Sequence, residues 1–236
     1  MSAPSAAISR RALPADGCEL RWLGHAAFAL TTPTTRLLLD PHQPGALGGR
    51  FRLPAIVGPF DAIACSHGHD DHAAWTPALG TQRWIEADDR VGALQLRFLA
   101  AAHDRQGGRR MGLTRMIAIE GPGWRVVHSG DLGAFGPREI AFARGCDLLL
   151  LAAGGTYTLD GAEAAAFCAA VAPRLVAPMH CADPAIDLPL APASDFVAAL
   201  GWPSASVPAW RSDDDTLADS TIVLLAPPAE PDQEHP

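Results

Sequence analysis

Metal-binding side chains are concentrated between positions 65 and 72, which read CSHGHDDH. Imidazole and carboxylate groups are the preferred ligands of divalent transition metals. His67 and His69 are two residues apart, so an extended chain can point both side chains the same way. Asp71 and His72 follow in a tight turn and can face a second ion. A solvated loop would more often contain Ser, Asn, Gly and Pro, so the cluster predicts a metal or catalytic site.

Several predicted strands lead directly into further histidine or aspartate side chains. They finish near Cys65, Ala102, His128 and Met179. Strands that deliver polar residues to one edge of a sheet build active sites on a rigid scaffold. We therefore expect these side chains to meet at one sheet edge.

The pattern of apolar residues predicts short strands first and then strands mixed with helices. The predicted strands cover 19–23, 26–31, 36–40, 61–66, 83–87, 94–102, 115–120, 125–128, 147–151, 174–178 and 221–225. Helices are predicted at about 160–171 and at 194–200, the first with a capping box between Asp160 and Glu163. The segment 42–59 is rich in Gly and Pro, and its length indicates either a functional lid or a disordered loop.

Composition places the chain among globular proteins, with 236 residues, 48% apolar residues and 19% charged residues. A net charge of −8 argues against nucleic acid or an anionic membrane as the main partner. All eighteen basic residues are Arg, which excludes lysine-based mechanisms. Five cysteines without a C-x-x-C pair favour a reducing compartment. With neither an apolar signal peptide nor a membrane span expected, the predicted location is the cytoplasm.

The expected organisation is one folded domain between two tails. Residues 1–16 are predicted to be a flexible lead-in, and 17–225 to form the domain. The segment 226–236 is predicted to be a disordered, Pro-rich acidic tail.

The order of the polar clusters resembles the ligand series of the metallo-β-lactamase-fold hydrolases. The matching positions are H-x-H-x-D-H at 67–72, a lone His103, Gly130-Asp131 and Pro178-Met179-His180. The stretches WLGHAAF at 22–28 and LDP at 39–41 are similar to the L-ascorbate-6-phosphate lactonase-like subgroup and to uncharacterised zinc-dependent hydrolases of this fold. Members often have Tyr after the last ligand histidine, where this chain has Cys181.

The resemblance implies an α/β fold, a four-layer αββα sandwich, with a dinuclear centre at the edge where its sheets meet. The first ion would be held by His67, His69 and His103, and the second by Asp71, His72 and His180, with Asp131 bridging both. Two divalent ions sharing a water make hydroxide available at neutral pH. Zinc suits the imidazole-rich set, and manganese or iron is also compatible with it. By analogy with the family, Asp71 would also accept a proton during catalysis.

Five further residues are candidates for supporting roles. The resemblance places His25 and Asp40 beside the metals, as hydrogen-bond partners of ligand histidines. A core histidine and a turn-forming aspartate before proline are the alternatives. Arg50 and Arg109 could bind an anionic substrate group, and the hydroxyl of Tyr157 could orient a substrate oxygen. Solvated arginines and a packing tyrosine are the simpler interpretations.

The predicted function is hydrolysis of a small ester, lactone or phosphoester by a metal-bridging hydroxide. One alternative is a phosphodiesterase or nuclease of the same fold, against which the acidic charge argues. Another is a metal-binding regulatory protein that has lost catalysis, against which the intact ligand set argues. A small-molecule substrate is the expected partner, and the oligomeric state is left open.

Overall fold

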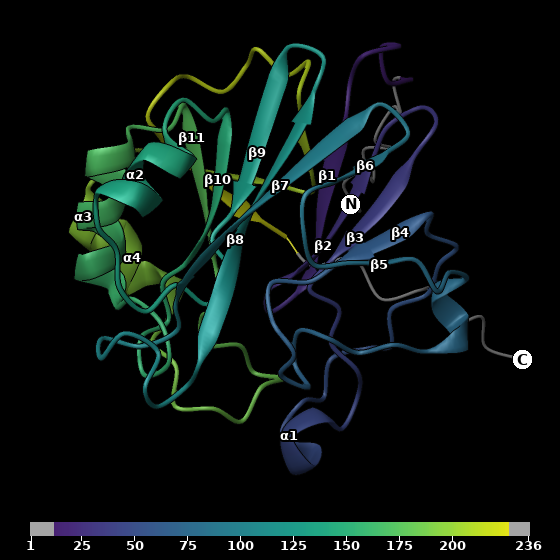
Figure 1. Ribbon diagram of the computed structural model, residues 1–236. Helices are drawn as coiled ribbons and strands as arrows, with labels where there is room; N and C mark the ends of the chain where they lie inside the picture. The colour runs from purple at the N-terminus through teal and green to yellow at the C-terminus, as the bar shows by residue number, and fades with distance from the viewer. Residues whose placement is uncertain (1–11, 227–236) are drawn as a thin grey trace, which may run out of the picture.

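The computed structural model describes residues 12–226, and within them two β-sheets pack face to face (Figure 1). The first sheet has the strand order β13-β1-β2-β3-β4-β5. Its strands are β1 (Glu19–Gly24), β2 (Ala27–Thr31), β3 (Arg36–Leu39), β4 (Ala62–Ala64), β5 (Trp84–Ile85) and β13 (Trp210–Arg211). β1, β2 and β3 are antiparallel neighbours, whereas β3, β4 and β5 are parallel. The carboxyl ends of β3 and β4 therefore reach the same edge.

The second sheet has the order β12-β14-β11-β10-β9-β8-β7-β6. Its strands are β6 (Asp89–Val91), β7 (Leu94–Ala102), β8 (Leu113–Gly121), β9 (Trp124–His128), β10 (Leu148–Ala152), β11 (Leu175–Met179), β12 (Ser204–Val207) and β14 (Thr221–Leu225). Strands β6 to β9 are antiparallel, and β9, β10, β11, β14 and β12 are parallel. The carboxyl ends of β9 and β11 thus share an edge.

Strand β10 shows that the second sheet is covered on both faces. Its sequence LLLLA is buried at every position. Successive strand side chains point to opposite faces, so Leu148 and Leu150 pack between the sheets, while Leu149 and Leu151 pack beneath the helices. A continuous apolar run is typical of a strand covered on both faces.

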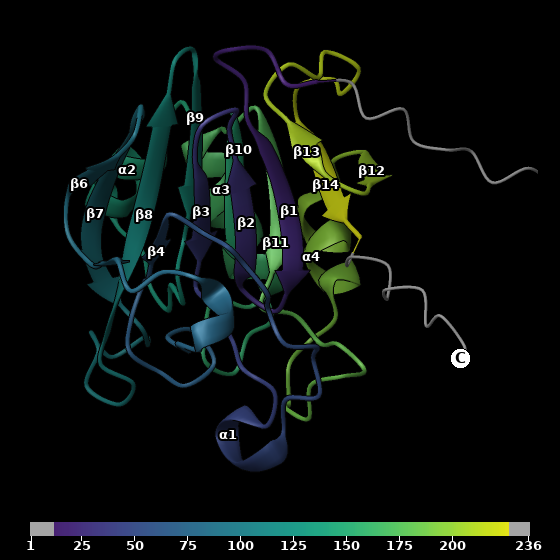
Figure 2. The ribbon, with the colours of Figure 1, turned by 90° about the vertical axis from the view of Figure 1, so that its right-hand side faces the viewer.

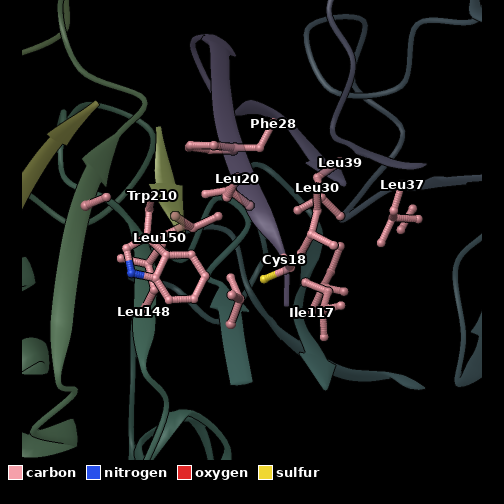
Figure 3. Packing of buried hydrophobic residues seen from close by; sticks show 14 of the residues in the cluster. Cys18, Leu20, Phe28, Leu30, Leu37, Leu39, Ile117, Leu148, Leu150 and Trp210 are labelled. Carbon is pink, nitrogen blue, oxygen red and sulfur yellow. The ribbon is translucent and has the colours of Figure 1, made fainter. Parts of the chain in front are cut away.

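The core between the sheets is made of aliphatic and aromatic side chains from both (Figure 3). One cluster contains Leu20, Phe28 and Leu30 of the first sheet and Ile117 of the second. It also contains Trp210 of β13. Each of these side chains is at most 1% exposed. Complete burial of a large apolar side chain contributes about 1.5–3 kcal/mol, which fixes the two sheets relative to each other.

Helices cover the outer face of the second sheet (Figure 1). They are α2 (Pro137–Ala143), α3 (Gly161–Val171) and α4 (Ala193–Leu200). The expected capping box starts α3, since Asp160 Oδ1 accepts from Glu163 N and Glu163 Oε2 accepts from Asp160 N. The predicted αββα sandwich is confirmed. On the first sheet, the outer layer contains Ile56 and Phe60 from a loop and the short helix η1 (Pro77–Leu79).

The helix α1 (Ala46–Gly49) lies beyond the sheet ends, at the bottom of both views (Figures 1 and 2). Its left-handed residues Leu47 and Gly48 interrupt regular helical geometry. The segment 42–59, expected only as a lid or a disordered loop, therefore contains a short helical turn and an isolated bridge from Phe51 to Ile186.

The sequence did not predict α1, α2, β6, β12 or β13. Residues 12–16 of the expected lead-in are described, and three carbonyls there accept hydrogen bonds: Ala12 O from Arg211 Nη2, Pro14 O from Gly17 N and Asp16 O from Trp124 Nε1. The rest of that lead-in, and the expected tail apart from Ala226, lie outside the described residues. Between residues 12 and 226, no helix is long and apolar enough to cross a membrane.

Candidate metal centre

Six strand ends deliver histidine or aspartate to one edge of the sandwich. From the first sheet, His25 follows β1, Asp40 follows β3, and the cluster at 67–72 follows β4. From the second, His103 follows β7, while β9 and β11 lead to Asp131 and His180. Most of these side chains are buried, but within the cluster at 67–72 His69 is partly exposed and Asp70 is exposed. The expected meeting point is therefore present in the structure.

Asp131 lies at the centre of this edge. Its Oδ2 is 3.2 Å from Nε2 of both His72 and His180, 3.3 Å from Nε2 of His103 and 3.8 Å from Nε2 of His67. One carboxylate oxygen thus faces four imidazole nitrogens that come from three separate segments. This is the arrangement expected of a carboxylate shared between two cations.

Within residues 12–226, three groups of side chains have all their ligand atoms within 4.8 Å of one another. One of them, formed by Asp40, His67 and His72, reflects the hydrogen bonding of Asp40, and the other two lie around Asp131. One group contains the side chains of His67, His69 and His103. The other contains the side chains of His25, Asp71, His72 and His180. The two predicted ligand sets are therefore each brought together, and His25 joins the second.

The hydrogen bonding of these side chains fits cation binding. Nε2 of His72, Nε2 of His103 and Oδ1 of Asp131 are buried and have no hydrogen-bond partner among the described residues. Buried polar atoms are normally hydrogen-bonded, and three orphaned donor atoms at one point indicate ligands for a metal ion. Neutral imidazole and carboxylate are ligands that zinc accepts.

Asp40 orients the ligand histidines from behind. His72 Nδ1–H donates to Asp40 Oδ2 at 2.9 Å, and Ser66 Oγ–H donates to the same oxygen at 2.5 Å. Ser66 Oγ in turn lies 2.9 Å from His67 Nδ1 and can accept from it. Asp40 Oδ1 accepts from Ser66 N at 2.7 Å. These contacts assign a proton to Nδ1 of both rings and leave Nε2 as the atom available to a metal. Nε2 of His72 faces Asp131 at 3.2 Å, and Nε2 of His67 lies 2.9 Å from Nδ1 of His69.

His103 is oriented by a backbone carbonyl instead. Its Nδ1–H donates to Tyr157 O at 3.0 Å. Asp131 is fixed through its own backbone, since Asp131 N donates to Thr114 Oγ1 at 3.1 Å. Gly130 is required before it, because a Cβ there would come within 2.6 Å of Arg115 O. The Gly-Asp pair in the sequence therefore reflects a close approach of two strand ends.

The pKa values of the histidines and aspartates in the cluster are shifted in different directions. Burial lowers the pKa of His67 to about 3, and the neighbouring His72 adds to this effect. Burial opposes ionisation of Asp131, but the nearby His180 and His72 hold its pKa well below the ordinary value. Burial also opposes a charged His72, yet Asp131 and Asp71 raise the pKa of this imidazole well above 6.5. The carboxylates are thus ionised, and a cation would replace the proton on His72.

A cavity of about 450 Å³ opens directly onto these side chains. Its metal-side wall contains His69, Asp71, His103, Asp131 and His180. A volume of this size suits a small molecule. Asp71 therefore both belongs to the donor set and faces the space available to a substrate.

The remaining lining of the cavity is mostly apolar and contains two of the predicted substrate contacts. Leu47, Met111 and Leu188 supply the apolar surface, and Arg50 and Tyr157 supply polar groups. None of the salt bridges between described residues involves Arg50. Arg109, the third predicted substrate contact, is exposed and is not part of the cavity wall formed by the described residues.

Several residues of the site were not expected from the sequence. The hydrogen-bonding roles of Ser66 and Thr114 were missed, although Ser66 directly precedes the cluster. The sequence did not indicate that Leu47 and Leu188 line the cavity, because they reach it only through the arrangement of the loops.

Comparison with known families agrees with this geometry. Residues 19–180, which include every ligand candidate, match the model of a beta-lactamase superfamily domain. The chain belongs to this superfamily. The match confirms the resemblance inferred from the order of the clusters and from the 22–28 and 39–41 stretches.

Named relatives extend the same result. A UPF0173 metal-dependent hydrolase from Cupriavidus taiwanensis is 30% identical over 234 residues, covering 75% of this chain and 80% of the relative. One from Thermus thermophilus is 25% identical and covers 69% and 83%. Among solved structures, a proposed Zn-dependent hydrolase of the metallo-beta-lactamase superfamily from Thermotoga maritima has a TM-score of 0.68 at 23% identity. That match covers 88% of this chain and 98% of the other, and it shows the shared fold.

Proposed function

We propose that this superfamily member is a dinuclear metal-dependent hydrolase that cleaves a small ester, lactone or phosphoester. The observation that carries the proposal is the position of Asp131 Oδ2, within 3.8 Å of four imidazole nitrogens. A single carboxylate oxygen between two donor groups is what two neighbouring ions require. The hydrolase assignment is also supported by the relatives, which are named metal-dependent hydrolases.

Two divalent ions would be held by the two donor groups. His67, His69 and His103 would hold one, and Asp71, His72 and His180 the other, with Asp131 shared. Zinc is the proposed metal because most donors are imidazoles, and manganese or iron would also fit the two carboxylates. When bound, such ions lower the pKa of water and polarise a substrate oxygen.

The protein's own groups supply positioning and proton transfer. Asp71 lies in the cavity wall, and its pKa is lowered by His72 and His25, which outweigh the opposing effect of burial. An ionised carboxylate beside the reacting centre can accept a proton from water and pass it to a leaving group. The hydroxyl of Tyr157, which also lines the cavity, would donate to the oxygen on which charge develops.

The cavity also limits the substrate. A volume of about 450 Å³ with an apolar wall suits a small molecule rather than a nucleic acid strand. Arg50 would bind an anionic group on that substrate by charge-assisted hydrogen bonds. The net charge of −8 also disfavours a polyanionic partner. Five free cysteines support the cytoplasm as the proposed location.

Metal analysis combined with a hydrolysis screen tests the proposal. The purified protein should bind close to two ions per chain after equilibration with zinc or manganese. It should then hydrolyse a member of a panel of lactones, carboxylic esters, thioesters and phosphodiesters. Asp131→Ala should lose metal and activity together. A protein that takes up no metal, or an Asp131→Ala variant with full activity, would refute the proposal, and activity on phosphodiesters alone would favour a phosphodiesterase.

A further inference from the structure

His25 is buried at the candidate centre with both ring nitrogens lacking a hydrogen-bond partner in the part of the chain that the structure describes. Its relative exposure is 1%. His128 provides the contrast, since its Nε2 donates to Ala26 O at 3.0 Å and its Nδ1 accepts from Gly130 N at 3.0 Å. A core histidine is normally satisfied in this way. The ring of His25 therefore requires another explanation.

The ring lies against the second donor group. Its centroid is 4.0 Å from that of His180 and 5.3 Å from that of His72. Nε2 is 3.3 Å from Asp71 Oδ2 and within 4.8 Å of the donor atoms of His72 and His180. Two ligands of one tetrahedral zinc ion, each bonded at 2.0–2.1 Å, are about 3.3 Å apart. The separation of Nε2 and Oδ2 is therefore short enough for both atoms to bond the same ion.

The backbone holds this side chain in place despite an unfavourable conformation. His25 has φ +53°, which is uncommon for a residue other than glycine. His25 O accepts from Trp22 Nε1 at 2.9 Å and from His180 N at 3.3 Å. Phe51 packs edge-on against the ring at 4.9 Å. Strained residues that neighbouring groups hold in place are concentrated at functional sites.

His25 also lies behind the donor atoms rather than beside the substrate space. It is not part of the wall of the 450 Å³ cavity, which on the metal side includes Asp71 and His180. Its Nε2 faces the carboxylate of Asp71 at 3.3 Å, within the second donor group.

We propose that His25 Nε2 is a direct metal ligand of the second position. This assignment rests on the proposed dinuclear centre, and it makes the number of donors unequal at the two metal positions. The second position then has five donors, from His25, Asp71, His72, His180 and Asp131. The first has four, from His67, His69, His103 and Asp131.

The unequal donor count predicts unequal binding. The second ion is held more tightly and is shielded by Phe51 behind His25. The first ion, whose ligands His69 and His103 line the cavity, keeps the position that is open to water and substrate. Titration of the metal-free protein should therefore fill two sites with distinct affinities.

Zinc affinity of single variants tests the assignment. The full-length protein, His25→Ala, His25→Gln and the control His42→Ala are stripped of metal, and both dissociation constants are measured by chelator competition. His42 is a matched control because it is buried, also contacts Phe51 and bonds through Nε2 to Pro54 O. The amide of Gln can still donate to Asp71, but it is a poor zinc ligand.

If His25 is a ligand, Ala and Gln both weaken the tighter site by more than about 100-fold, beyond the 10–100-fold typical of outer partners. The wild type binds two zinc ions, and His42→Ala binds two ions with the same dissociation constants as the wild type. Wild-type affinity in His25→Gln would overturn the assignment and leave His25 as a positioning residue for Asp71, with the dinuclear centre intact. Failure of the wild type to bind a second ion would overturn both proposals.

A crystal structure of the zinc-loaded wild type gives a readout that does not depend on folding of the variants. Anomalous scattering locates the ions, and Nε2 of His25 should lie within about 0.2 Å of the usual zinc–nitrogen distance of 2.0–2.1 Å. A zinc ion more than 3 Å from that nitrogen would refute coordination.

Discussion

Replacement of Asp40 by Asn should uncouple the hydrogen-bond network from the metal ligands without changing the shape of the site. Asp40 is fully buried and accepts from Ser66 N, Ser66 Oγ and His72 Nδ1. In Asp40→Asn the amide oxygen can still accept from Ser66 N. The amide nitrogen, however, is a donor and cannot accept from His72 Nδ1–H.

The consequence is a change of tautomer in His72. Its Nδ1 would become the acceptor, and the proton would move to Nε2, the atom that faces Asp131 at 3.2 Å. A protonated Nε2 cannot bind a metal. Loss of an outer-shell partner typically weakens metal binding by 10–100-fold, or about 1.4–2.8 kcal/mol. The metal-free variant should also lose about 1.5–3 kcal/mol of unfolding free energy, the value of a hydrogen bond to a charged group.

Two measurements separate these effects. Chelator competition gives the zinc dissociation constants, and urea denaturation of the metal-free protein gives the free energy of unfolding. Asp61→Asn is the matched control, because Asp61 is exposed and its Oδ2 also accepts from a backbone amide, Arg36 N at 2.7 Å. Wild-type zinc affinity in Asp40→Asn would refute the tautomer argument, whatever happened to stability.

Three further results are expected. Arg50→Ala should raise KM for anionic substrates by about 10–100-fold, the value of a charge-assisted hydrogen bond, with an unchanged metal content, because Arg50 lines the cavity and is not one of the donors. Tyr157→Phe should lower kcat by about 100-fold or more, as for other oxyanion donors, with KM nearly unchanged in steady-state assays. Denaturation of the metal-free protein should show a free energy of unfolding that falls as pH decreases from about 6.5 toward 4. Burial lowers the folded-state pKa of His25 and His67 to about 3 and lowers that of His42, so the unfolded chain binds more protons in this range.

Controls exist for each of these results. Arg109→Ala is the comparison for Arg50, because Arg109 is exposed and lies outside the described cavity wall; an effect confined to Arg109 would contradict the proposed anion position. Tyr157→Phe keeps the carbonyl that accepts from His103, so a lost metal would show that the substitution acts on structure. His42→Phe should make the pH slope shallower. The raised pKa of His72 opposes the trend only near pH 6.5, because at lower pH this imidazole is protonated in both the folded and the unfolded state. A free energy of unfolding that does not change between about pH 5.5 and 4 would therefore refute the argument.

The clustering of the candidate donors was largely predictable because these side chains follow strands or lie in local sequence clusters. The run at 67–72 and the isolated His103, Asp131 and His180 could be ordered by comparison with a known family pattern. Strands such as β10 and helix α3 were also readable, since apolar runs and a capping box are local signals. Each of these features depends on residues that are close in sequence.

Features that depend on tertiary contacts were missed. Strand β13 contains two residues, and β12 alternates half-buried and exposed positions without a clear apolar face. Thr114 supports Asp131 across a gap of 17 residues, and nothing in its own sequence neighbourhood indicates that contact. His25 gave an ambiguous signal because a lone histidine next to glycine is consistent with either a core or a ligand role.

The residues that line the cavity come from two kinds of structural element, strand ends and loops. The donor side chains follow strand ends, whereas Leu47, Arg50 and Leu188 of the lining come from two loops that pair with each other. Phe51 bridges Ile186, Arg52 N donates to Ala185 O at 2.8 Å, and Asp187 N donates to Arg50 O at 2.9 Å. A small apolar cluster that includes Phe51 and Ile186 joins the loops into one unit.

This loop unit can vary in sequence without disturbing the donors on the strands. Its side chains Leu47 and Leu188 form cavity wall, while its backbone hydrogen bonds keep the wall in place. Rigid scaffolds that present variable loops let one reaction act on different substrates. Substitution of these leucines should therefore change which esters or lactones are cleaved, while the zinc content stays the same. Phe51 is the exception, because it contacts His25 at 4.9 Å and couples the loop to the second donor group.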